Sequence, residues 1–120
     1  MTAPNLKTPN IITGKFASYN CTSTLASALS NSASSNKVFK VNTIRAANID
    51  GVNSSSVDIS LYRSSTHSYI AYQIPVPAQS SLIVLSKEEY IYLEEGDAIY
   101  AKATASNQIT LTLSYEDISA

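Results

Sequence analysis

The chain has 120 residues, a length that suggests one domain with a core large enough to need no metal or disulfide. Only 14% of the residues are charged and the net charge is −1, which excludes recruitment of nucleic acid or an anionic membrane by a basic surface. Serine, threonine and asparagine make up 39 of the 120 residues and supply the polar surface instead.

Cys21 is the only cysteine, so an intrachain disulfide and a multi-cysteine metal site are both excluded. We expect it to be a small hydrophobic residue of the core or of an interface. The opening "MTAPNLKTPN" lacks the basic start and apolar run of a signal peptide, and no run of 18 apolar residues would span a membrane. We therefore expect a protein that is made and folds in a reducing cytosol.

The first 36 residues differ from the rest of the chain. "MTAPNLKTPN" has almost no periodicity, "KFASYNCTSTLAS" has some strand character, and "TLASALS" can form a short turn of helix. The serine-rich "SNSASSNK" is typical of a polar hinge. We predict an extended N-terminal arm and hinge over 1–36, ordered by a neighbouring subunit or not at all, and a compact domain over 37–118.

Four strands are predicted in the middle of the chain, at 37–47, 56–63, 68–74 and 81–86, because apolar residues alternate or cluster there. Asp50-Gly51 predicts a hairpin turn after the first of them, and "SSTH" (64–67) predicts a polar turn after the second. Pro75 and Pro77 cannot donate to a strand ladder, so they indicate an edge strand or a crossing between sheets.

The last two strands have the clearest patterns. Ile99, Ala101 and Ala103 alternate with polar or tyrosine positions, and the final strand alternates through Ile109, Leu111, Leu113 and Tyr115. The short Ser106-Asn107 link between them predicts a hairpin. Because strands recur about every 10–12 residues, the chain favours an all-β, antiparallel sandwich of jelly-roll type.

Three carboxylates, Glu94, Glu95 and Asp97, surround Gly96 and raise the question of a metal site. Adjacent strand residues point to opposite faces, and glycine supplies the backbone freedom of a turn. We predict a solvated turn between two strands, and no metal or other cofactor.

His67 is the only histidine, and no Gly-x-Ser-x-Gly nucleophile motif exists to accompany it. We expect a solvated turn residue at this position, and the chain offers no constellation typical of an enzyme.

Eight tyrosines and no tryptophan make tyrosine the main aromatic residue of the surface. Tyrosine provides a rigid surface with a polar tip, which suits a wet interface. Tyr62 and Tyr100 fall on the outward side of their strands and are candidate interface residues, with Phe16 and Tyr19 of the arm as further candidates. Exposed aromatic residues are also compatible with a carbohydrate-binding module.

The segments "NKVFKVNTIRAANIDG…VDISLY" and "IPVPAQSSLIVLSKEEYIYLEEGDAIYAKATASNQITLTLSYEDI", which span roughly 37–118, resemble small virion structural proteins of tailed bacteriophages. The pattern "L..GD.I" is also similar to a corner found in trimeric β-sandwich modules.

The resemblance implies a capsid decoration or cement protein that stabilises the head by binding the capsid lattice. Its partners would be the major capsid protein or other virion proteins, and it would be a homotrimer in virions assembled in the bacterial cytoplasm. A neck, tail or baseplate component is the alternative within the same class, and a carbohydrate-binding β-sandwich module is a further one.

Overall fold

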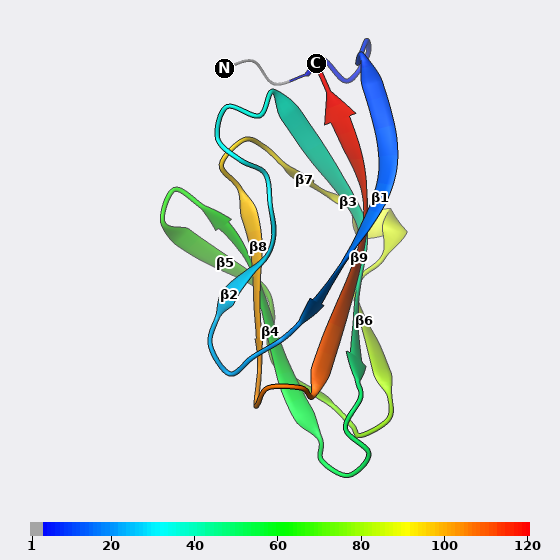
Figure 1. Ribbon diagram of the computed structural model, residues 1–120, viewed down its shortest axis with the longest axis vertical. Coiled ribbons are helices and arrows are strands. Elements are labelled where there is room, and N and C mark those ends of the chain that lie inside the picture. The colour runs from blue at the N-terminus through cyan, green and yellow to red at the C-terminus, as the bar shows by residue number, and fades with distance from the viewer. Residues whose placement is uncertain (1–3) are drawn as a thin grey trace.

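Two antiparallel sheets pack face to face in the computed structural model, which describes residues 4–120 (Figure 1). This confirms the all-β sandwich. The first sheet contains β1 (Ile11–Asn20), β9 (Ile109–Ser119), β3 (Lys37–Asn48) and β6 (Ser81–Leu85) in that order, with β7 (Ile91–Leu93) also paired to β3. The second contains β2 (Ala26–Ser30), β8 (Ala98–Ala103), β4 (Ser55–Arg63) and β5 (Thr66–Val76). A short 3-10 helix, η1 (Lys87–Glu89), follows β6.

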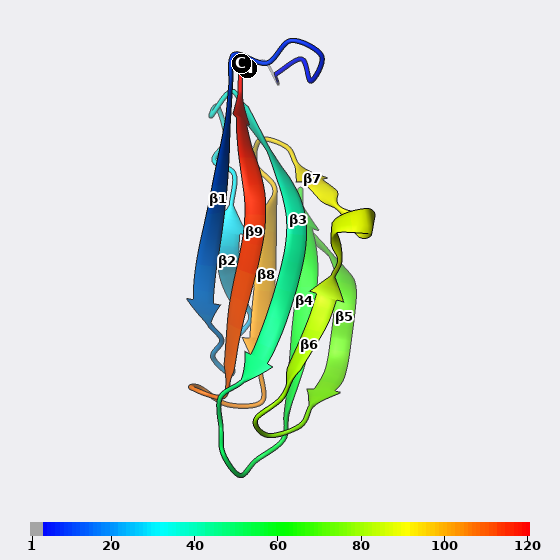
Figure 2. The same cartoon turned by 90° about the vertical axis from the view of Figure 1, so that its right-hand side faces the viewer.

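Early strands pair with late strands and the central strands pair with each other, so the chain resembles a long hairpin folded into two sheets. β4 pairs with β5, β3 with β6 and β7, β2 with β8, and β1 with β9, all antiparallel. The roll is closed by pairing β3 with β9 in one sheet and β4 with β8 in the other, as Figure 2 shows for the first sheet. This order is that of a jelly roll.

The core lies between the sheets and is built from the alternating positions that the sequence indicates. Ile109, Leu111 and Leu113 of β9 are fully buried, and they face Val57 and Ile59 of β4. Cys21 is also fully buried within this core, as expected. Burial of such side chains supplies most of the free energy that holds the two layers together.

The division at residue 36 was wrong, because both sheets contain strands from the first 36 residues. β1 pairs with β9 over ten residues, from Ile11↔Ser119 to Asn20↔Thr110. β2 replaces the predicted helical turn and pairs with β8. The error has a physical cause: both are edge strands, and an edge strand with one half-buried face shows weak alternation in its sequence.

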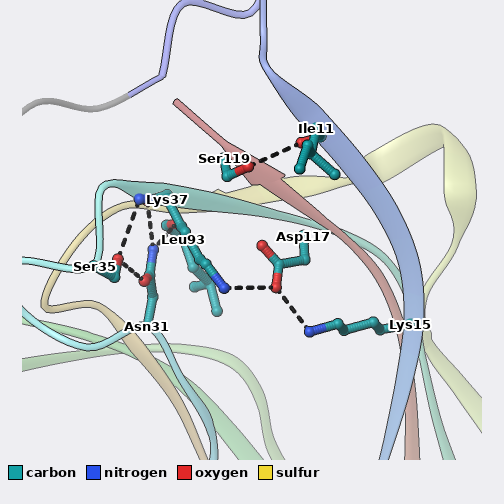
Figure 3. Close-up of polar contacts among 8 residues, drawn as sticks. All are labelled: Ile11, Lys15, Asn31, Ser35, Lys37, Leu93, Asp117 and Ser119. Carbon is teal, nitrogen blue, oxygen red and sulfur yellow. Dashed lines mark hydrogen bonds and ion pairs between the residues drawn. The ribbon is translucent and has the colours of Figure 1, made fainter.

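Asp117 of β9 ties the first strand to the sheet through two lysines (Figure 3). Its carboxylate Oδ2 lies 2.9 Å from Lys15 Nζ of β1 and 3.2 Å from Lys37 Nζ of β3. Burial alone would raise the pKa of Asp117, but the hydrogen bonds from the two lysines outweigh it and lower the pKa below its ordinary value. Asp117 is therefore a charged group held between three adjacent strands.

The serine-rich segment after β2 is tied to the sandwich by the buried Asn31 rather than acting as a free hinge. Asn31 Nδ2 donates to the carbonyl oxygens of Lys37 at 2.9 Å and Leu93 at 3.0 Å, and its Oδ1 accepts from Ser35 Oγ at 2.6 Å (Figure 3). The Asn31 side chain thus joins the ends of strands from both sheets.

Two predicted hairpins are crossings between the sheets. The Asp50-Gly51 loop joins β3 of the first sheet to β4 of the second, and Ser106-Asn107 lies between β8 and β9, which also belong to different sheets. Both are sharp turns, but turn chemistry does not specify which strand a chain pairs with afterwards. The hairpin that does form joins β4 to β5 through Ser64 and Ser65, whose φ angles of 51° and 63° are both positive.

The edge position indicated by Pro75 is confirmed, because Pro75 lies in β5, the last strand of the second sheet. Within residues 4–120, the structure contains no helix with the length and hydropathy needed to cross a membrane.

Candidate functional site

A pocket of about 430 Å³ opens where the β4–β5 hairpin faces β7; we call it the hairpin pocket. Leu61 of the second sheet and Leu93 of the first contribute its apolar surface. Tyr62 and Tyr92 add aromatic surface. The remaining lining residues are polar: Arg63, Ser64, Thr66, Ser68 and Asp97.

The polar side of the hairpin pocket is organised by Arg63, the last residue of β4. Its Nε donates to Asp97 Oδ1 at 2.8 Å and its Nη2 donates to Asp97 Oδ2, so the pair is bidentate. Nη2 also donates to Glu94 Oε2 at 2.8 Å. These contacts fix the orientation of the guanidinium at the pocket wall.

The electrostatics of this group favour its charged state. Burial acts to raise the pKa of Asp97, but the hydrogen bonds from Arg63 and from the Glu94 backbone outweigh it, and the pKa is lowered. The hydrogen bond and charge of Asp97 raise the pKa of Arg63 above its ordinary value. Arg63 and Asp97, the charged residues that line the pocket, cancel each other's charge, and Glu94, which contacts Arg63 from outside the lining, adds one negative charge nearby.

The turn that places Asp97 is the one that the sequence predicts. Gly96 has a φ angle of 87°, and Asp97 Oδ2 accepts a hydrogen bond from the Glu94 backbone N at 2.8 Å across the turn. The prediction that all three carboxylates are solvated was wrong for Asp97, which is 5% exposed. Its burial is compensated by Arg63, a partner 34 positions away that the local pattern does not reveal.

Tyr62 and Tyr100, two of the candidate interface residues, lie side by side on the face of the second sheet that points away from the core. Their ring centroids are 5.0 Å apart, and the ring of His67 lies 4.9 Å from each of them. All three side chains are half-buried, so they present one mixed aromatic surface. Their role as interface residues stays a prediction.

The expectation of a solvated turn residue at position 67 was wrong. His67 lies in β5 opposite Tyr62, and its Nδ1 is 3.0 Å from Ser60 Oγ. The turn consists of Ser64 and Ser65 alone, so it ends two residues before the predicted turn over 64–67 does, and His67 lies on the strand. A histidine next to a serine is not by itself catalytic; it also needs a group that orients the ring and an oxyanion site.

Phe16 and Tyr19, the other two candidates, lie on opposite faces of β1. Tyr19 packs against the core, whereas Phe16 is 74% exposed. Three further apolar side chains that precede Phe16 in the sequence are also exposed, and Ile12 shares the outward face of β1 with Phe16. We call this set the N-terminal apolar surface: Leu6, Ile11, Ile12 and Phe16.

A metal centre finds no support among residues 4–120, where no three His, Cys, Asp or Glu side chains are grouped closely enough to hold an ion. The only cysteine is buried, and burial raises the pKa of its thiol to about 12, which disfavours the nucleophilic thiolate.

The sequence did not predict the hairpin pocket, because its residues come from two stretches that are far apart in the chain, 61–68 and 92–97. The one available signal was Arg63, a lone arginine at the end of an apolar strand with acidic residues later in the chain. No family model matches this chain and a search of curated proteins finds no relative, so its function is inferred from the residues and their arrangement.

Proposed function

We propose that this chain is a bacteriophage virion structural protein, and within that class a capsid decoration protein that stabilises the head by binding the capsid lattice. The observation that carries the proposal is the N-terminal apolar surface on an edge strand of a jelly roll. The resemblance over 37–118 to small virion proteins supports it independently.

The N-terminal apolar surface has the features of an attachment site. Ile12 and Phe16 point away from the core, since Ala17 and Tyr19 occupy the inward positions of the same strand. Large apolar side chains exposed on one face of a strand, as Ile12 and Phe16 are, are candidates for an interaction surface. On a capsid, each copy would bury this surface against the shell and gain about 25 cal/mol per Å² of apolar area removed from water.

The rest of the outer surface suits many copies on one particle. The charged fraction is low and the net charge is −1, so neighbouring copies repel one another weakly. We place the contact between copies on the opposite edge of the sandwich, where β5 exposes Tyr69, Ile70, Tyr72 and Ile74. A homotrimer, as in the trimeric sandwich modules that the sequence resembles, is the proposed arrangement.

Locating the protein in purified phage particles tests the proposal. We expect mass spectrometry to find it in virions and cryo-electron microscopy to place it on the outer face of the head. Density at the neck, tail or baseplate would replace decoration by the alternative within the class. Absence from virions would overturn the structural role altogether.

A matched pair of variants tests the attachment surface. Phe16→Ser is expected to weaken rebinding to capsids stripped of the protein by at least about tenfold, because it removes a large exposed apolar contact. Val52→Ser changes a residue that is 85% exposed in the loop between β3 and β4, so it should rebind like the unmodified protein. Equal rebinding by both variants would contradict the proposed surface.

A further inference from the structure

The hairpin pocket has a composition that neither the core nor the attachment surface explains. Its volume of about 430 Å³ falls in the range of ligand pockets, roughly 300–1,000 Å³. Its surface combines two leucines and two tyrosines with three hydroxyl side chains and an ion pair. Ligand pockets typically join an apolar surface to a few placed polar groups in this way.

The polar groups of the hairpin pocket keep unused hydrogen-bonding capacity. Among the contacts of the described residues, the hydroxyls of Ser64 and Ser68 have no hydrogen-bond partner, and Thr66 makes one long bond of 3.5 Å. Arg63 binds its carboxylates through Nε and Nη2, and Nη1 has no partner among residues 4–120. The wall therefore offers hydroxyls that donate or accept and a guanidinium edge that donates.

Charge decides which ligand class fits. Arg63 is already neutralised by Asp97, and Glu94 places a further negative charge on the far side of Arg63, so the pocket offers no free positive charge to a phosphate or carboxylate ligand. A purely apolar ligand would leave the polar groups of the wall without partners. A neutral ligand that carries many hydroxyl groups on a carbon ring satisfies both constraints.

Tyr92 supplies the remaining element of recognition. It lines the hairpin pocket from β7, its side chain is 39% exposed, and an edge-on contact with Tyr90 at 5.6 Å restricts its ring. A rigid exposed tyrosine can pack against the C–H face of a sugar ring while its hydroxyl stays wet. Strand addition by a peptide is less suited to this place, because β7 is only three residues long.

We propose that the hairpin pocket binds a neutral saccharide unit of a glycan, with Tyr92 packing against the ring and Arg63, Thr66 and Ser68 bonding its hydroxyls. The site is separate from the N-terminal apolar surface and does not rest on the proposed virion role. A virion protein with such a site would hold surface glycans at the particle as well as contacting its shell.

NMR titration of the 15N-labelled full chain tests the site with maltohexaose, cellohexaose, laminarihexaose and mannohexaose at millimolar concentration, and with hexagalacturonate as the anionic control. We expect at least one neutral hexasaccharide to shift the amide signals of Ser64, Thr66, Ser68 and Leu93. Hexagalacturonate should leave them in place.

Variants distinguish binding in the hairpin pocket from non-specific binding to exposed apolar side chains. Tyr92→Ala is expected to weaken binding of the active sugar at least about tenfold, whereas Ile83→Ala, which alters an exposed apolar side chain of β6 outside the pocket, should leave it unchanged. The double variant Thr66→Ala, Ser68→Ala changes two exposed hydroxyls and should also weaken binding without disturbing the fold.

Three results would overturn the proposal: no neutral hexasaccharide shifts the pocket signals, hexagalacturonate binds as tightly as the best neutral sugar, or Ile83→Ala weakens binding as much as Tyr92→Ala. None of these results bears on capsid binding, which depends on Phe16 at the other edge of the sandwich. Conversely, a protein absent from virions can still pass every step of the sugar test.

Discussion

Arg63 at the end of β4 donates two hydrogen bonds to the carboxylate of Asp97, and the two residues are 34 positions apart in the chain. Asp97 lies in the turn between β7 and β8, so this pair connects the β4–β5 hairpin to the turn that leads from the first sheet to the second. Because both residues line the hairpin pocket, their ion pair holds its two sides together.

Asp97→Asn should therefore lower the free energy of unfolding by about 1–2 kcal/mol, because a buried acceptor of two charge-assisted bonds loses its charge beside a partly exposed arginine. Glu94→Gln is the matched control, since that carboxylate contacts the same guanidinium from an exposed position. It should cost less than about 0.5 kcal/mol. Urea unfolding measures both, and equal losses would contradict the distinction.

Acid should destabilise the protein through Asp117. Its pKa is lower in the folded chain than its ordinary value of 3.8, so the unfolded chain binds a proton first as the pH falls. The stabilising contribution of the Asp117 carboxylate is fully present at neutral pH. It is lost as the pH falls from 3.8, the ordinary pKa, through the lower pKa of the folded chain. Urea midpoints from neutral pH to about pH 2 should fall less for Asp117→Asn than for the unmodified protein. Parallel curves would show that Asp117 contributes nothing to the acid response.

Cys21 should be unreactive until the protein unfolds. Its side chain is fully buried, and burial raises the pKa of its thiol to about 12, so neither access nor thiolate is available in the native state. Ellman's reagent should react with the native protein far more slowly than with the same protein in urea. Equal rates in the two conditions would place Cys21 at the surface.

Asn31→Ala should cost about 2–3 kcal/mol, because it leaves two backbone carbonyls near the sandwich end without the donors that they now have. Ser35→Ala removes the hydroxyl that donates to Asn31 and accepts from the Lys37 backbone N at 3.2 Å, and it should cost about 1 kcal/mol. Thermal and urea unfolding of the two variants provide the comparison. A loss for Asn31→Ala no larger than that for Ser35→Ala would mean that the amide is not the link between the sheets.

Much of the sandwich could be predicted because its central strands obey a simple rule. β9 buries Ile109, Leu111 and Leu113 on one side and leaves the intervening residues more exposed, so alternation identifies both the strand and its inward face. β4 keeps the same rule on its inward side with Val57 and Ile59.

What could not be predicted depends on partners that are distant in the chain. β1 lies at an edge and its first six residues are exposed, so its sequence shows little alternation of apolar and polar residues. Only its pairing with β9 identifies it as a strand of the sheet. The inter-sheet loops have the same turn residues as hairpins. Arg63 and Asp97 each belong to an unremarkable local pattern, and only the roll of the sheets brings them together.

The nested pairing of the strands also bears on the order in which the chain can fold. The Ser119 hydroxyl donates to the carbonyl of Ile11, and the two residues are 108 positions apart in the chain. The strand pairs nested inside this one join residues that are progressively closer in the sequence. A ribosome would release β1 long before its partner exists, so the first strand must wait as an unpaired apolar segment. Folding should therefore be slow for a chain of this size, and its final step should join the earliest strand to the latest one.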